Sequence, residues 1–491
     1  MMIMTTIVCY FAALLVIARI TGRRGSSNAV FFKGENKSPW YVVAFGMIGA
    51  SISGVTFVSV PGMVRNEGMT YIQMVAGFFV GYLIVAHVLL PLYYRLNLTS
   101  IYTYLGHRIG IRTYRTGSLF FLLSRMLGTA AKLYLVCLIL YTYVFEAMDV
   151  PFWIIAAGAV ALVWFYTQKS GIKTIVWTDT LQTLCLIVAL IFMIIAIARH
   201  LDLDMQGMVR AITEHEHSRM FIFDDWVSKQ NFVKQFLSGI FIVIVMTGLD
   251  QDMMQKNLTC RNLKEAQKNM YCYGFSFIPL NLLFLSLGIL LLVLADRMQM
   301  ELPLMNDDIL PMFATQGHLG QSVTVLFTIG IIAAAFSNSD SALTAMTTSF
   351  CVDILHTDKD PEDIARRKRR KVHIVMSAAL IAFICFFRIV NNQSVINVIY
   401  TVASYTYGPL LGMFCFGLFT RRTTADKWVP GIAIASPLIC FALNELTIAC
   451  FRYTFGYELL MLNGALTFAG MWVCSTRQRD RQSVSTSKPT E

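Results

Sequence analysis

The second apolar segment of the chain contains the sequence GASISGVTFVSVPG at residues 49–62. Its glycines and Pro61 oppose a continuous helix, and a broken membrane helix exposes backbone carbonyls that can coordinate a hard cation. Gly49, Ile52, Ser53 and Thr56 follow the i, i+3, i+4, i+7 spacing of one helix face. The same small residues also suit a packing face against a neighbouring helix, so the segment alone leaves both interpretations open.

The composition places this segment in a membrane. Of 491 residues, 56% are hydrophobic and only 14% are charged, and the mean hydropathy is +0.60. So few charges cannot cover the surface of a water-soluble protein of this length, which excludes soluble globular and disordered classes. The net charge of +11 does not indicate nucleic acid as a partner, because the basic residues form short runs between apolar stretches.

About thirteen segments reach the length of roughly 20 apolar residues that a membrane-spanning helix needs. The sequence therefore predicts an all-α integral membrane protein. Basic residues occupy every second gap, among them the gap after residue 250 with Lys256, whereas the gaps at 200–230 and 297–319 are acidic. This alternation predicts a multi-pass protein of the cell membrane with its N-terminus outside and its C-terminus in the cytoplasm. The segments lie at 3–20, 40–62, 69–93, 115–147, 150–168, 174–199, 231–250, 269–296, 320–352, 371–389, 393–420, 427–447 and 457–474.

The ninth segment carries a stripe of polar residues at a depth where they are costly. Ala334, Ser337 and Ser341 follow helical spacing, with Asn338 and Asp340 beside them. Oxygen ligands without His or Cys suit a small hard cation, although Ser and Thr can also bond back to their own helix. The sixth segment adds Asp179, which is either a functional carboxylate or a charge near a helix start.

The fourth segment carries two cations, Arg125 and Lys132, seven residues apart. Lys132 is too central to reach the membrane surface easily by snorkelling. Either a buried acid or an anionic substrate can balance such charges, and we favour the substrate.

Seven short motifs together resemble the sodium/solute symporter family, which includes sodium–glucose, sodium–proline and bacterial sodium–sialic acid transporters. The resemblance covers nearly the whole chain through the order and spacing of its parts. These are Phe31-Phe32, GASISG at 49–54 with Pro61-Gly62, PLYYRLNLTSIYTYL at 91–105, GIKTIVWTD at 171–179, GLDQDMMQ at 248–255, SNSDSAL at 337–343 and YGPLL at 407–411.

The resemblance implies a leucine-transporter-like core of two inverted five-helix repeats, each opening with a broken helix. We expect an N-terminal helix and cytoplasmic loop at 1–39, followed by the first repeat at 40–199 and an extracellular loop at 200–230. The second repeat follows at 231–420, then two C-terminal helices at 421–475 and a cytoplasmic tail at 476–491.

The resemblance also implies binding residues. A sodium site would use the carbonyls of Gly49, Ile52 and Ala334 with the side chains of Ser337 and Asn338, although the family usually has Ser or Thr at the last position. A second sodium site, found in some members, would use Asp179, Ser337, Asp340 and Ser341, with Asp340 in place of a hydroxyl. Solute contacts would come from Ser53, Thr56, Arg125 or Lys132, and Gln73.

We therefore expect a sodium-coupled symporter that imports a small polar organic solute by alternating access and is not an enzyme. An acidic sugar such as sialic acid, or another carboxylate, fits the two cations, while neutral sugars and amino acids remain alternatives. A transporter-like sensor and a channel are the non-carrier alternatives. The expected partners are sodium ions, the small-molecule solute and the lipid bilayer.

Overall fold

The computed structural model describes residues 2–21, 38–145, 148–167, 171–315, 319–390 and 395–476. The predicted basic loop at 22–37, including Phe31-Phe32, and the tail beyond 476 lie outside these ranges. Almost all described residues are helical. One short antiparallel pair joins β1 (Thr423–Thr424) to β2 (Ser475–Thr476) and ties the start of the C-terminal helix pair to its end.

Every predicted segment has a helical counterpart. Eight helices are long and apolar enough to cross a membrane, or ten if each of two bent pairs forms one span; α9 and α20 are shorter apolar helices. The helices that match the segments are α1 (Met2–Thr21), α3 (Trp40–Ser51) with α4 (Gly54–Glu67), α5 (Tyr71–Ile84) with α6 (Leu90–Arg95), α8 (Ile111–Leu140), α9 (Phe152–Thr167), α10 (Gly171–His200), α12 (Phe232–Val243) with α13 (Gln251–Asn257), α14 (Leu263–Met298), α16 (Gln321–Ser349), α17 (Glu362–Val390), α18 (Val395–Phe419), α19 (Val429–Phe451) and α20 (Leu459–Val473).

The two bent pairs confirm that the first helix of each predicted repeat is broken. The axes of α3 and α4 differ by 57°, and the span from Phe232 to Gly248 differs from α13 by 70°. At the first break Ile52 and Ser53 leave the helical region, with ψ values of 85° and 170°. At the second break Asp250 is extended, and its side chain accepts hydrogen bonds from two backbone amides at the start of α13. The repeat boundaries themselves stay a prediction.

The small residues of the first break also pack closely against α10. An ideal Cβ on Gly49 would lie 1.9 Å from Oγ1 of Thr183, and one on Gly46 would lie 3.2 Å from Cβ of Asp179. Both interpretations of this segment therefore hold, because the glycines that weaken the helix are the ones that let α3 approach α10. Pro61 lies inside α4 and does not end it.

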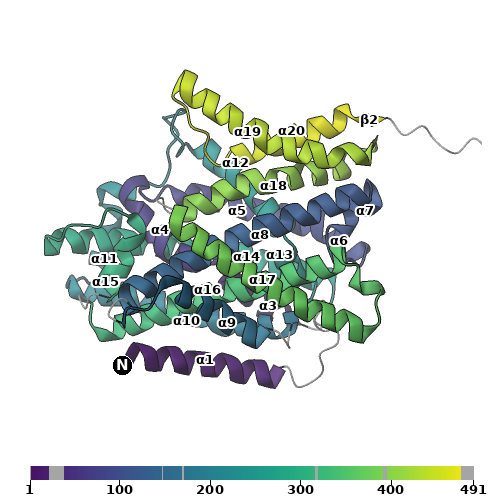
Figure 1. Cartoon of the computed structure of the whole chain (residues 1–491). Coiled ribbons are helices and arrows are strands. Elements are labelled where there is room, and N and C mark those ends of the chain that lie inside the picture. The colour runs from purple at the N-terminus through teal and green to yellow at the C-terminus, as the bar shows by residue number, and fades with distance from the viewer. Residues whose placement is uncertain are drawn as a thin grey trace, which may run out of the picture.

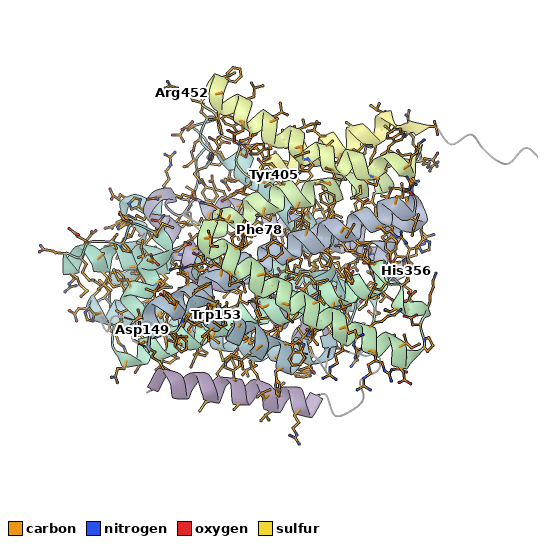
Figure 2. The ribbon with its side chains drawn as sticks, viewed as in Figure 1. Phe78, Asp149, Trp153, His356, Tyr405 and Arg452 are labelled. Carbon is orange, nitrogen blue, oxygen red and sulfur yellow. The ribbon has the colours of Figure 1, made fainter. Side chains whose placement is uncertain are left out.

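The helices run side by side across Figure 1, with α1 along the lower edge and α19 and α20 along the upper edge. Short helices of the connecting loops gather at the two ends of the bundle. Those at the left end are α11 (Met205–Thr213) and α15 (Ile309–Thr315), whereas α6 and α7 (Thr103–Arg108) lie at the right. Figure 2 places Asp149 and Arg452 at the left end and His356 at the right. Alternate loops thus lie at opposite ends, as alternating spans require.

The seventh predicted segment differs from the structure. We expected it to end at residue 250 and assigned Lys256 to a basic loop. The chain instead turns at the second break and continues as α13, whose residues are all buried, including Lys256 at 1% exposure. The prediction was wrong because Asp250, Gln251 and Asp252 lower the local hydropathy, although these polar residues face other polar groups inside the protein.

Candidate functional site

The break between α3 and α4 leaves the carbonyls of Gly49 and Ile52 outside the helical hydrogen-bond ladders. The amide of Ser53 donates to the carbonyl of Ser51 instead of that of Gly49, four residues back. The ladder of α4 begins where the amide of Phe57 donates to Ser53, one residue after Ile52. The carbonyls of Gly49 and Ile52 are therefore not used as acceptors by α3 or α4, and a hard cation can take their lone pairs.

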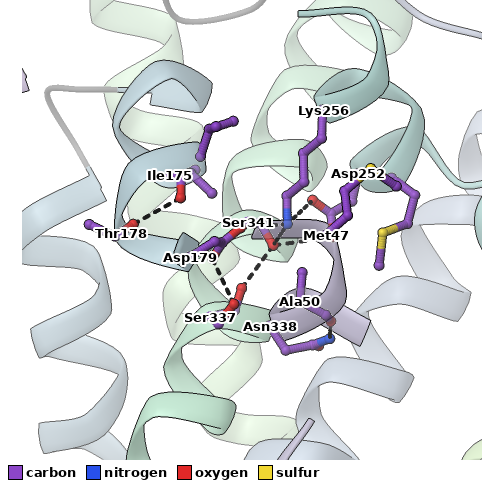
Figure 3. A network of polar contacts seen from close by, with 12 residues as sticks. Met47, Ala50, Ile175, Thr178, Asp179, Asp252, Lys256, Ser337, Asn338 and Ser341 are labelled. Atoms are coloured by element: carbon purple, nitrogen blue, oxygen red, sulfur yellow. Dashed lines mark hydrogen bonds and ion pairs between the residues drawn. The ribbon is translucent and has the colours of Figure 1, made fainter. Parts of the chain in front are cut away.

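Asn338 on α16 joins this break directly. Its Nδ2 donates to the carbonyl of Ala50 at 2.7 Å, as Figure 3 shows. Its Oδ1 is buried and has no hydrogen-bond partner among the described residues. A buried amide oxygen without a donor is costly unless a cation or water satisfies it. Ala334 and Ser337, which share this stretch of α16 with Asn338, are also buried.

Three residues of the predicted second sodium site are brought together, and a lysine lies among them. Oγ of Ser337 donates to Asp179 Oδ1 at 2.6 Å. Nζ of Lys256 lies 2.9 Å from Asp179 Oδ2 and donates to Oγ of Ser341 at 3.0 Å (Figure 3). Asp179 is the ninth residue of α10 and is fully buried, so the alternative of a charge at the helix start does not apply. Asp340, the fourth predicted ligand, is buried one residue before Ser341.

A second ionic cluster surrounds Arg125 on α8. Its Nη2 donates to Asp252 Oδ2, and its Nη1 lies 3.5 Å from Asp250 Oδ2. Tyr407 on α18 donates to the same Asp250 oxygen at 2.5 Å. Arg125 is 5% exposed and both carboxylates are 0% exposed, so the arginine is already balanced by protein carboxylates. Our preference for an anionic substrate as the partner of Arg125 is therefore not supported.

A cavity of about 90 Å³ lies between the two broken helix pairs and α8. Both Arg125 and Lys132 line it. Among the described residues Lys132 makes no hydrogen bond or ion pair, in contrast to Arg125. Apolar side chains form much of the remaining wall, and hydroxyl groups are contributed by Ser51, Ser53, Thr56, Tyr82, Thr247, Tyr273 and Tyr400.

Several of these hydroxyls already form a chain. Tyr82 donates to the hydroxyl of Tyr273 at 2.9 Å, and Tyr273 also contacts the hydroxyl of Ser51. At the start of α5, the hydroxyls of Tyr71 and Tyr400 lie 2.9 Å apart. A wall of aromatic hydroxyls with one unpaired ammonium suits a polyhydroxylated anion, because hydroxyls can both donate and accept.

Gln73 lies away from this cavity. Its Nε2 donates to the carbonyl of Gln230 at 2.8 Å, and its Oε1 accepts from the amide of Ile222 at 2.9 Å. Both partners belong to the long loop before α12. Gln73 thus anchors that loop to α5, and it does not join Ser53, Thr56 and Lys132 at the cavity wall.

The charged groups around the two helix breaks include one more carboxylate than cations. The four carboxylates are those of Asp179, Asp250, Asp252 and Asp340, and the three cations that interact with them are Arg125, Lys132 and Lys256. When all are ionised, four minus three leaves a net charge of −1. An excess charge in a medium of low dielectric attracts a mobile counter-ion strongly. One monovalent cation would neutralise this group of charges.

Sequence reasoning missed Asp250, Asp252 and Lys256, although all three lie within or beside the motif GLDQDMMQ. We used this motif only to support the family resemblance and assigned its charged residues no role in a site. An available signal was the density of ionisable residues directly after an apolar segment, which is unusual unless the chain stays inside the protein.

A family model described as the sodium:solute symporter family matches residues 31–434 of this chain. Among curated proteins, the sodium/sialic acid symporter NanT of Aliivibrio fischeri is 23% identical over 93% of this chain and 91% of that protein. The sodium/sialic acid symporter SiaT of Proteus mirabilis is 24% identical over 87% and 86%. The human sodium/iodide cotransporter is 24% identical over 84% of this chain and 64% of that protein.

Solved structures share the fold. A substrate-bound, outward-open Na+-coupled sialic acid symporter matches with a TM-score of 0.81, 19% identity, and coverage of 97% of this chain and 99% of that one. A closed conformation of Mhp1, a nucleobase-cation-symport-1 family transporter, matches with a TM-score of 0.57, 16% identity, and coverage of 91% and 94%. The predicted inverted-repeat transporter fold is thereby confirmed.

Proposed function

This chain belongs to the sodium:solute symporter family, and we propose that the solute it carries together with sodium is a small organic anion of the acidic-sugar type. The observation that carries this proposal is the ammonium group of Lys132, which lines a cavity with many hydroxyl groups and makes no hydrogen bond or ion pair among the described residues. A carboxylate is the natural complement of such a group, because a desolvated lysine is costly until an anion pairs with it. The relatives named for sialic acid transport support this solute class.

The sodium ion would bind where α16 meets the break between α3 and α4. Its ligands would be the carbonyls of Gly49, Ile52 and Ala334 and the side chains of Ser337 and Asn338. Support comes from the carbonyls of Gly49 and Ile52, which lie outside the helical hydrogen-bond ladders, and from Oδ1 of Asn338, which has no hydrogen-bond partner among the described residues. The net negative charge of the groups around the helix breaks also favours a bound cation. Bound sodium would hold the broken helix against α16 and so stabilise the wall that carries Ser53 and Thr56.

Alternating access follows from this placement. With the cytoplasmic side taken as the end that bears α6 and α7, the solute would enter past Tyr71 and Tyr400 at the other end. A cavity of about 90 Å³ is smaller than the roughly 300–1,000 Å³ of most ligand sites, so it must widen for a sugar acid. Separation of α16 from the broken helix at the cytoplasmic side would loosen the sodium site and release both cargoes.

Uptake into proteoliposomes tests the solute class. We expect an inward sodium gradient to drive accumulation of radiolabelled sialic acid, and potassium or choline gradients to drive none. Unlabelled sugar acids should compete, whereas neutral sugars of the same size should not. Competition by neutral sugars or amino acids alone would contradict an anionic solute, and passive equilibration without accumulation would indicate a channel.

Asn338→Ala should raise the sodium concentration that gives half-maximal uptake by about tenfold. The side-chain oxygen without a partner would be lost, and a hydrogen bond or ligand to a charged group contributes about 1.5–3 kcal/mol. The matched control is Ser339→Ala, one residue away and equally buried, whose hydroxyl donates to Ala335 of its own helix. Equal sodium dependence in the two variants would remove Asn338 from the site.

A further inference from the structure

The ammonium group of Lys256 lies at the centre of an oxygen cluster that resembles a cation site. It contacts Asp179 at 2.9 Å and Ser341 at 3.0 Å, and it lies 3.9 Å from Asp252. The side chain reaches this point from α13, which also carries Asp252, whereas Asp179 belongs to α10 and Ser341 to α16 (Figure 3). It is 1% exposed, so its charge is balanced by these groups and not by water.

The same contacts occupy the ligands that a second sodium ion would need. Asp179 accepts from Ser337 with one oxygen and faces Lys256 with the other. Ser341 accepts from Lys256 and lies 3.3 Å from Asp252. A hard cation at this position would require that the ammonium leave, because two positive charges cannot share these oxygens in a medium of low dielectric.

We propose that Lys256 acts as a built-in cation in place of a second sodium ion, so that the chain binds and moves a single sodium ion per cycle. The inference rests on the proposed sodium coupling. Its physical basis is that a lysine nitrogen with oxygen neighbours at about 3 Å satisfies the same carboxylate and hydroxyl that a mobile ion would satisfy. A sodium ion can leave the site together with the solute, whereas the ammonium group of Lys256 cannot.

The stoichiometry has a consequence for the driving force. One sodium ion and one monovalent anion carry no net charge, so their joint passage responds to the sodium concentration ratio and not to the membrane potential. The empty interior and the fully loaded interior then carry the same net charge. A transporter that moved two sodium ions with the same anion would instead be accelerated by a negative interior potential.

Direct binding of radioactive sodium to the purified, full-length protein tests this inference without any solute. We expect one sodium ion per wild-type chain. Lys256→Gln should bind two, because Asp179 and Ser341 lose their cation while keeping their oxygens. Lys256→Arg should bind one, and Asp179→Asn combined with Lys256→Gln should return to one, because neither charge remains. Size-exclusion profiles would establish that each variant is folded.

The outcomes separate the two proposals. A wild-type chain that binds no sodium would contradict the sodium coupling itself. A wild-type chain that binds one ion, with a folded Lys256→Gln variant that also binds one, would overturn only the role of Lys256. Two sodium ions bound to the wild type would also overturn the role of Lys256. That measurement needs only the wild-type protein, so it applies even if Lys256→Gln does not fold. In proteoliposomes, we expect uptake of a monovalent anion by the wild type to be unchanged by a potassium-diffusion potential.

Discussion

Lys132→Gln should reduce the efficiency of sodium-driven uptake of an acidic solute by roughly a hundredfold. The variant keeps a polar side chain at the cavity wall. It removes the one positive charge of that wall that makes no hydrogen bond or ion pair among the described residues. Loss of one partner of a desolvated charge pair costs about 3 kcal/mol, and each 1.4 kcal/mol corresponds to a factor of ten. Initial uptake rates over a range of solute concentrations would measure the change.

Controls distinguish this effect from a general loss of structure. Lys132→Arg retains the charge and should retain most of the activity. Arg115→Gln removes an exposed cation from the same helix and should have no effect. Lys132→Gln itself should remain folded, because the substitution breaks no hydrogen bond or ion pair among the described residues. Normal uptake of acidic solutes by Lys132→Gln would refute the proposed contact.

Asp252→Asn is expected to cause the largest loss of stability. Its carboxylate contacts Arg125 and Ser341 and lies 3.9 Å from Lys256, and it is 0% exposed. Removing one partner of a buried ion pair leaves the other charge uncompensated, which typically costs about 3–5 kcal/mol. The thermal unfolding midpoint in detergent should therefore fall well below that of the wild type.

Two further variants test whether the stability loss of Asp252→Asn comes from the broken buried ion pair. Arg125→Met combined with Asp250→Asn and Asp252→Leu removes all three charges of this cluster and should recover most of the lost stability, because neither the guanidinium nor a carboxylate is left without its partner. Asp224→Asn breaks the pair with Arg219, whose side chains are 57% and 68% exposed, and should change the midpoint little. A midpoint for Asp252→Asn equal to that of Asp224→Asn would mean that the Arg125 cluster does not contribute to stability.

Local patterns predicted a large part of this molecule. Low charge and long apolar runs require membrane helices, since backbone amides cannot remain unpaired in lipid. The glycines at 46, 49 and 54 predicted a weak point, and the helix breaks at Ile52–Ser53. The second break was expected only from the family resemblance. The predicted seventh apolar segment ends at the residue where this break begins, so hydropathy gave no sign of the helix that follows.

The resemblance also selected the residues of both ion sites, but it assigned no charged side chain a partner within the protein. Arg125 and Lys132 share one helix and similar surroundings in the sequence, so hydropathy and spacing treat them alike. Their roles diverge only because Asp250 and Asp252 follow a bend that brings them to Arg125 and not to Lys132. Lys256 was assigned to a loop because the sequence did not show that the chain bends at this point and stays inside the protein.

The membrane class, the order of the helices and the first break thus depend on neighbouring residues, because backbone solvation and glycine flexibility act over a few positions along the chain. The pairing of buried charges depends on contacts between α8, α10, α13 and α16, with Arg125 and Asp252 separated by 127 positions. Coulomb attraction and desolvation vary with distance in space and not along the chain. For that reason, only the packed helices distinguish the balanced Arg125 and Lys256 from the unpaired Lys132.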